Sequence, residues 1–251
     1  MSSQANTVNA TRTSFRIIEV LKRLDGAGVT AVASELDIPK STVHNHLQTL
    51  LEERYVLKEG DTYSVGLRFL ELGEFTRTRM DIYETVRPET ETLAEKTGEM
   101  VNAAVEEHGQ GVYITRHEGQ QAVSVDTYAG KRVYLHCTAL GKAILAELPE
   151  ARVDEILDEH GMPQRTENTM TDPDELKAEL ETIRERGYAY DREERLPGLR
   201  CVAAPVVTDG VVAALSVSGP TTRIKGDMFH EEIPELLLSA ANVVEINMAY
   251  S

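Results

Sequence analysis

The chain has 251 residues, and 41% of them are apolar, a composition typical of a protein that forms a core rather than of a disordered one. Its 42 Asp and Glu against 26 Lys and Arg give a formal net charge of −16, which argues against a polyanionic partner if the charge is evenly spread. No run reaches the roughly 20 apolar residues of a membrane span, and no signal peptide is recognisable at the start of the chain. The sequence therefore predicts a cytoplasmic protein without a membrane partner.

The negative charge is not evenly spread. Residues 1–78 carry nine Lys and Arg against ten Asp and Glu, whereas residues 79–251 carry 17 against 32. The first part is therefore almost neutral and leaves room for a nucleic-acid partner. Arginines (18) outnumber lysines (8) and tryptophan is absent, a pattern that resembles the proteins of salt-loving archaea. An ordinary acidic protein is the alternative.

The first predicted element is a helix over "SFRIIEVLKRL". Ser14 is a candidate N-cap, and Gly26 or Gly28 would end the helix. Its helical spacing places one set of side chains on an apolar face: Phe15, Ile18, Leu21 and Leu24.

The next segment, residues 30–66, predicts a short helix, a turn at Asp37-Ile38-Pro39, a longer helix from about Lys40 to Arg54, and a hairpin across Glu-Gly-Asp. The apolar face of the longer helix comprises Val43, Leu47, Leu50 and Leu51. Its other side is rich in hydrogen-bonding side chains and has no carboxylate in residues 38–51. Two helices joined by a tight turn and followed by a two-stranded wing indicate a winged helix-turn-helix.

A carboxylate directed into a DNA groove would face phosphates, whereas Ser, Thr, Asn, Gln and His can bind base edges or phosphate oxygens. The acid-free face therefore predicts binding to double-stranded DNA. The candidate DNA contacts are Arg12, Lys40, Ser41, Thr42, His44, Asn45, His46, Gln48 and Lys58. A small helical packing or dimerisation unit is the alternative.

Residues 66–99 are helical in period and rich in charge, with interruptions at Pro88 and Gly98. We expect these helices to link the winged unit to the rest of the chain. They could also pair with a second copy, or their charges could simply face solvent.

From about residue 100 the pattern is that of short strands, "VNAAVEE", "GVYITRHE", "AVSVDTY" and "RVYLHC", followed by helices over "TALGKAILAEL" and "DPDELKAELETIRERG". The strands "RCVAAPVVTD" and "VVAALSVSGP", joined by Asp209-Gly210, and a last helix over residues 231–250 complete the chain. This order predicts an α+β fold with a mainly antiparallel sheet covered by helices.

A candidate anion site lies where the helix after Thr138 begins. Thr138 is placed to cap that helix, so that the N–H groups of Ala139, Leu140 and Gly141 point out of its positive end. Gly141 would allow a ligand to approach closely, and Lys142 could add charge or face water. Ser216 and Ser218 are two apart on a predicted strand and therefore share one face of the sheet.

The winged unit, taken with "LHCTALGKAILAEL", "ERGYAYDREERLPGLRCVAAPV" and "VVAALSVSGPTTRI", resembles the IclR family of prokaryotic transcriptional regulators from about residue 11 to 250. The resemblance implies a winged helix-turn-helix DNA-binding domain at residues 11–72, linker helices at 73–98 and a GAF-like effector-binding domain at 99–251. It also implies a homodimer or a dimer of dimers bound to an operator, and a small-molecule effector.

By the same resemblance, the family's pocket positions fall on Val133, Ala139, Leu140, Asp191, Leu199, Cys201, Ser216 and Ser218. A small organic acid is the family's usual kind of ligand. Asp191 would repel a bare carboxylate but accept hydrogen bonds from hydroxyl groups, so we favour a hydroxylated acid or a sugar-derived metabolite. Asp191 could instead lie on the surface, and the two serines could bond only within the sheet.

Cys137 and Cys201 raise the alternative of a thiol-dependent enzyme. Neither the count nor the spacing of the cysteines indicates a disulfide framework or a zinc site. His136 precedes Cys137 directly, and neighbours on a strand point to opposite faces, so His136 is not placed to activate that thiol. We expect buried thiols, no enzymatic activity, no cofactor and no metal. A metabolite sensor that does not bind DNA is the other alternative.

Overall fold

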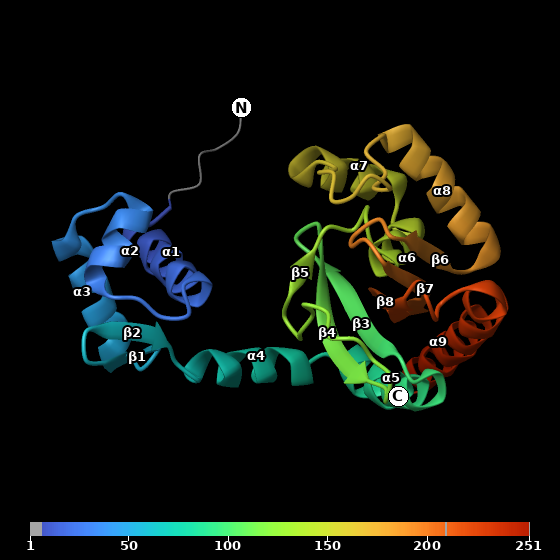
Figure 1. Ribbon diagram of the computed structural model, residues 1–251, viewed down its shortest axis with the longest axis horizontal. Coiled ribbons are helices and arrows are strands. Elements are labelled where there is room, and N and C mark those ends of the chain that lie inside the picture. The colour runs from blue at the N-terminus through green and yellow to red at the C-terminus, as the bar shows by residue number, and fades with distance from the viewer. Residues whose placement is uncertain (1–6, 209, 251) are drawn as a thin grey trace. The chain divides into compact units, whose positions relative to one another are not determined.

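The computed structural model describes residues 7–208 and 210–250. The chain forms two compact units, Met1–Thr76 and Arg77–Ser251, which are coloured in sequence from blue to red in Figure 1. Asp209, the first residue of the expected Asp209-Gly210 turn, lies outside the described residues. Within the described part of the chain, no helix has both the length and the apolar character needed to cross a bilayer.

The first unit is a winged helix-turn-helix. Its elements are α1 (Asn9–Arg23), α2 (Val29–Leu36), α3 (Lys40–Glu52), β1 (Val56–Glu59) and β2 (Thr62–Val65), and α4 (Arg68–Thr78) follows. The two strands pair antiparallel from Val56↔Val65 to Glu59↔Thr62, and Gly60 in the turn has a φ of +58°. One small core, which includes Ile17, Leu21, Val32, Leu47 and Tyr63, holds the helices against the wing.

The structure differs from the sequence-based expectation for α1. This helix begins at Asn9, with Val8 at its N-cap, and Ser14 lies inside it rather than capping it. The buried residues are Ile17, Ile18, Val20 and Leu21, whereas Phe15 is 59% exposed. The buried face of α1 thus excludes Phe15, because residues 17–21 supply its contacts with the core of the winged unit.

The second unit contains a six-stranded sheet in which every pairing is antiparallel, in the order β5-β4-β3-β8-β7-β6. The strands are β3 (Met100–Glu107), β4 (Gln110–Glu118), β5 (Arg132–Val133), β6 (Ala189–Arg192), β7 (Leu199–Thr208) and β8 (Val211–Pro220). The expected α+β class with a mainly antiparallel sheet is therefore confirmed.

Helices cover both faces of this sheet (Figure 1). Against one face pack α5 (Asp81–Thr97) and α9 (Ile233–Ala249), the latter preceded by a short π-helical turn (Met228–Glu232). The other side carries α6 (Ala139–Glu147), α7 (Glu150–His160) and α8 (Pro173–Arg186). Along β3, Val101, Ala103 and Val105 point to the α5/α9 face and Ala104 points to the α6 face, as the period of a strand requires.

Two further expectations need correction. The expected linker of residues 73–98 is divided, because α5 buries Ile82, Val86 and Leu93 in the core of the second unit. The segment "AVSVDTY", residues 122–128, forms no strand. Its backbone bonds are local, such as Thr127 N–H to Val125 C=O at 2.7 Å, and only the two residues of β5 return to the sheet beside β4.

Candidate functional site

The outer face of α3 is exposed and polar. Val43, Leu47 and Leu50 are buried in the winged unit, so the opposite side of the helix faces solvent. The exposed side chains there are Lys40, Ser41, His44, Asn45 and Gln48, and Thr42 is half-buried beside them. Gln48 Nε2 donates to Glu52 Oε1 at 3.2 Å. This surface offers hydrogen-bonding groups and a single cation to a groove.

His46 differs from the other candidate DNA contacts. It is half-buried, and its Nδ1 lies 2.9 Å from Ser14 Oγ of α1. The ring therefore faces α1 rather than the outer side of α3. Two other candidates lie off α3: Arg12 is exposed on α1, and Lys58 is exposed on β1 with Nζ 5.3 Å from the ring centroid of Tyr63.

In the second unit, several of the predicted pocket residues share the α6 face of the sheet. Cys201 of β7 lies between its register partners, Asp191 of β6 and Ser218 of β8. Ser218 Oγ donates to Cys201 Sγ at 3.0 Å. Ser216 lies on the same face, two residues along β8, and is fully buried. Val133 is buried at the β5 edge, and Leu199 is half-buried at the start of β7.

The N-terminus of α6 is directed at this buried region. Thr138 is the N-cap, and its Oγ1 accepts the Gly141 N–H at 3.0 Å. The N–H groups of Ala139 and Leu140 have no acceptor among the residues that the structure describes, although both residues are buried. Unpaired N–H groups at the positive end of a helix favour an anion. The candidate anion site therefore has two free N–H donors, those of Ala139 and Leu140, rather than the three expected from the sequence.

Gly141 has a different role from the one expected. A Cβ at this position would lie 2.1 Å from the Leu135 carbonyl oxygen and 2.3 Å from Leu135 Cα. The glycine is thus required by the backbone of the preceding segment, which lies against α6 at this point. The glycine in the segment "ALGKA" therefore allows α6 to pack closely against the Leu135 backbone.

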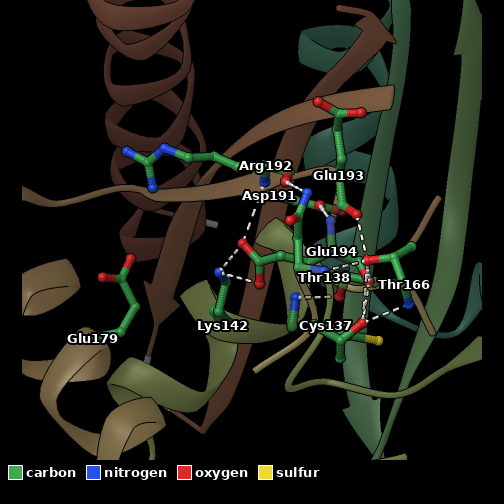
Figure 2. A network of polar contacts seen from close by, with 12 residues as sticks. Cys137, Thr138, Lys142, Thr166, Glu179, Asp191, Arg192, Glu193 and Glu194 are labelled. Atoms are coloured by element: carbon green, nitrogen blue, oxygen red, sulfur yellow. Dashed lines mark hydrogen bonds and ion pairs between the residues drawn. The ribbon is translucent and has the colours of Figure 1, made fainter. Parts of the chain in front are cut away.

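Lys142 neither faces water nor points to a ligand. Its side chain is fully buried, and Nζ lies 2.6 Å from both carboxylate oxygens of Glu194 (Figure 2). Glu194 belongs to the segment that connects β6 to β7, and its Oε1 also accepts the Arg192 N–H at 3.3 Å. This ion pair fixes that segment against α6.

Threonines hold the same segment from the other side (Figure 2). Thr166 Oγ1 donates to the Glu193 carbonyl at 2.7 Å. Thr169 Oγ1 donates to the Glu194 carbonyl at 2.6 Å. Two backbone carbonyls of the "DREER" segment are therefore bonded inward, and Asp191 and Glu194 of this segment are buried, whereas Arg192 is exposed. The inner side of the segment forms a wall of the buried region.

Asp191, at the start of that segment, is 3% exposed, which excludes the surface position considered from the sequence. Its Oδ1 accepts the Glu194 N–H at 2.7 Å. Burial, and next the nearby Glu194 carboxylate, raise the pKa of Asp191 from 3.8 to about 7. Near neutral pH this carboxyl group can therefore either donate or accept a hydrogen bond.

The two thiols are poorly suited to nucleophilic chemistry. Burial raises the pKa of Cys137 and of Cys201 to about 12, so both stay protonated near neutral pH. The Nε2 atom of His136 faces the Pro163 carbonyl at 3.3 Å instead of a thiol. Within residues 7–208 and 210–250, no three His, Cys, Asp or Glu side chains are grouped to hold a metal ion.

Comparison with protein families matches both units. Residues 12–60 match the IclR helix-turn-helix domain, and residues 75–245 match the family described as the bacterial transcriptional regulator IclR, C-terminal. The chain belongs to the IclR family of transcriptional regulators. An IclR-family chain combines a helix-turn-helix DNA-binding domain with a C-terminal effector domain, and the two units described above correspond to them.

Relatives of known name support this placement over almost the whole chain. A probable helix-turn-helix transcriptional regulator, ArcR, of Halobacterium salinarum is 30% identical, covering 98% of this chain and 96% of the relative. The acetate operon repressor of Salmonella typhimurium is also 30% identical, over 94% of this chain and 88% of its own length. The crystal structure of the Thermotoga maritima IclR is similar with a TM-score of 0.79 and 31% identity, over 96% of this chain and 99% of that one.

The sequence did not reveal every polar group in the effector domain of this IclR-family chain. Arg195 Nη1 donates to the buried Tyr113 hydroxyl at 2.9 Å, which ties the β6–β7 segment to β4. Asn102 of β3 is buried on the α6 face. A lone asparagine inside the apolar run "VNAAV" was the signal that could have identified it.

Proposed function

We propose that the effector of this regulator is a small hydroxylated carboxylic acid, bound between the N-terminus of α6 and the polar side chains of the sheet. The buried, unpaired N–H groups of Ala139 and Leu140 support this proposal most directly, because they favour a carboxylate. Ser216, Ser218 and Asp191 lie on the facing strands and suit hydroxyl groups.

The charges around this region favour an anion that also carries hydroxyl groups. The Lys142 charge is taken up by Glu194, so the positive features that remain are the helix terminus and Arg195, whose charge acts on both Cys137 and Cys201. Asp191 can donate a hydrogen bond while it is protonated, but once ionised it would repel a bare carboxylate. The name of the Salmonella relative, an acetate operon repressor, also places that relative in carboxylic-acid metabolism.

For the DNA-binding domain, we propose that the outer face of α3 enters the major groove. The proposed contacts are Lys40, Ser41, Thr42, His44, Asn45 and Gln48, with Arg12 and Lys58 on flanking phosphates. His46 is omitted from this set because it is bonded to Ser14. Effector binding would shift the fraction of molecules able to bind the operator. We propose that the protein acts in the cytoplasm.

We also propose a homodimer formed through the winged unit. A groove of about 560 Å³ is lined by side chains from α1, α3 and α4 and the segment between α3 and β1, among them Phe15, Ile18, Leu50, Tyr55 and Leu72. Phe15 and Leu72 are exposed. A second copy would bury them and supply the second half-site contact. Phe15→Ser should shift the mass measured by sedimentation towards the monomer, and an unchanged mass would contradict this interface.

Binding to the chain's own promoter fragment, measured by fluorescence anisotropy, tests the DNA surface. Lys40→Ala and Asn45→Ala should each weaken binding about tenfold, since a base or phosphate contact is worth about 1–3 kcal/mol. Lys22→Ala, which removes an exposed lysine on α1, is the matched control and should bind as the parent does. Unchanged binding by both test variants would disprove the role of α3.

The effector site is tested by the same assay with glycerate added. Thr138→Val should abolish the response to glycerate, because the cap that sets the α6 terminus is lost. Asp172→Ala removes the N-cap of α8, whose Oδ1 accepts the Asp174 and Glu175 N–H groups, and controls for a general loss of stability. An equal loss of response in both variants would argue against ligand binding at α6.

A further inference from the structure

Three polar side chains form a row across the α6 face of the sheet, which we call the polar row. Asn102 of β3 is the register partner of Ser216 on β8 and of Arg116 on β4. Register partners lie side by side, with Cβ atoms about 5 Å apart. The three side chains therefore follow one another along a line across the strands.

Asn102 faces the same side of the sheet as the N-terminus of α6. Its strand neighbours Val101 and Ala103 belong to the core beneath α5 and α9. Ala104, which has the same orientation as Asn102, lies in the apolar cluster that contains Ala139 and Leu140. Asn102 thus lies two residues along β3 from Ala104, just beyond the apolar cluster that contains the first turn of α6.

Two buried atoms of the polar row lack full hydrogen bonding. Asn102 is 2% exposed, and its Oδ1 makes no hydrogen bond to the described protein. Ser216 is 0% exposed, and its Oγ has only a weak contact with the Cys201 thiol. A buried polar group without a partner costs roughly 1–3 kcal/mol, and most buried polar groups are paired. These two atoms lie on neighbouring strands and both face α6. Together they form a polar site to which a ligand group could bond.

The chemistry of these atoms defines which ligand group can bond to them. The amide oxygen of Asn102 only accepts hydrogen bonds, so its partner must donate, and Ser216 Oγ can do either. An ionised carboxylate cannot donate, whereas a hydroxyl group can. Arg116 does not change this conclusion, since its guanidinium already bonds Thr127 Oγ1 at 3.2 Å and pairs with Glu118.

We propose that Asn102 is a specificity-determining residue, which with Ser216 receives a hydroxyl group of the effector while the carboxylate lies at the N-terminus of α6. The assignment rests on the proposed function above and adds to it a second polar subsite. It explains why an amide interrupts an apolar strand. An effector would then be selected by a hydroxyl group set apart from its carboxylate.

Calorimetric titration of the full chain with acetate, glycolate, glycerate and gluconate tests this assignment. These probes share a carboxylate and differ in the length of the hydroxyl-bearing chain. The parent protein should bind a hydroxylated probe at least about tenfold more tightly than acetate. Asn102→Leu should remove about a tenfold preference, equivalent to about 1.4 kcal/mol, and leave acetate binding unchanged. Ser216→Ala should act in the same direction.

Stability separates this role from a structural one. Because Asn102 Oδ1 has no partner to lose, Asn102→Leu should melt at the same temperature as the parent or higher. Asn242→Leu, on an exposed position of α9, is the matched control and should alter neither binding nor selectivity.

The outcomes distinguish the two proposals. If the parent binds acetate and the hydroxylated acids equally, or if Asn102→Leu weakens all of them equally, the role of Asn102 is overturned and the carboxylate site at α6 stands. If no carboxylate binds the parent, the proposed effector class fails and the role of Asn102 fails with it.

Discussion

Lys142 Nζ lies 2.6 Å from both carboxylate oxygens of Glu194, and both side chains are almost completely removed from solvent. The two residues belong to α6 and to the segment after β6, so the pair joins two walls of the effector region. A buried ion pair adds little net stability over an apolar pair, but losing one member leaves a charge without compensation. The geometry of the region therefore depends on both.

Lys142→Met should lower the free energy of unfolding of the effector domain by about 3–5 kcal/mol, because Glu194 stays buried without its partner. The double variant Lys142→Met, Glu194→Gln should recover much of that loss. Urea unfolding followed by circular dichroism measures both. A single variant as stable as the parent would show that the pair is not buried in solution.

Asp191 should make the domain less stable as the pH rises from about 4 to about 7. In this interval the unfolded chain releases the Asp191 proton while the folded chain retains it, so the unfolding free energy falls with pH and levels off above about pH 7. A pKa rise from 3.8 to about 7 corresponds to about 4 kcal/mol at about 1.4 kcal/mol per pKa unit. Asp191→Asn keeps an oxygen for the Glu194 N–H and should flatten the slope measured by urea unfolding at several pH values. If the variant showed the same pH dependence of the unfolding free energy as the parent, titratable groups other than Asp191 would cause it.

Gly141→Ala should destabilise the effector domain by more than about 2 kcal/mol, since the added Cβ meets the Leu135 backbone, which cannot move aside as a flexible side chain can. Gly73→Ala in α4 is the control, because nothing lies within 4 Å of the added Cβ, and alanine there should be neutral or stabilising. Thermal melting compares the two. Equal melting temperatures would mean that the Leu135 segment can shift.

His44 and His46 should respond differently to substitution although they are two residues apart on α3. His44→Ala removes an exposed side chain and should weaken operator binding without changing the melting temperature. His46→Ala removes the partner of Ser14 and should lower the stability of the winged unit by about 1 kcal/mol while the folded fraction binds DNA normally. If His46→Ala weakened operator binding and left the melting temperature unchanged, His46 would be a DNA contact after all.

Operator binding should depend on salt less steeply than it does for basic winged-helix proteins. Three proposed phosphate contacts, Arg12, Lys40 and Lys58, give a slope of about −2.7 in log affinity against log salt for each winged unit, or about −5 for a dimer. Anisotropy titrations over a range of KCl concentrations measure this slope. A value near −10 would require many more phosphate contacts.

The winged unit was accessible from the sequence because its signals are local. The spacing of Val43, Leu47 and Leu50 places α3 within two residues of its observed end, and the turn before it and the wing after it have short-range signatures. The start of α1 was missed for the opposite reason. Ser14 looks like a cap, but its hydroxyl bonds the Ala10 carbonyl and lies beside His46, 32 residues away.

The chemistry of the effector region was harder to predict because its partners are distant. All of α6 from Ala139 to Ala146 is buried, so periodicity cannot show which way Lys142 points, and Glu194 is 52 residues away. The segment 122–128 alternates like a strand but has no neighbour to pair with. The shared face of Ser216 and Ser218, in contrast, follows from strand period alone, and the structure has both serines on the α6 face.

The division of the chain at Thr76 also separates its charge. The winged unit is nearly neutral and the remainder is strongly negative, so in dilute salt a nearby duplex would repel one part of the molecule and tolerate the other. Approach through the winged unit would then be favoured over approach through the acidic unit, before any contact is made. At 1 M salt the screening length is about 3 Å, and this preference would disappear. Because salt screens the repulsion between the acidic unit and the duplex, encounter rates should rise with salt even where the final contacts are unchanged.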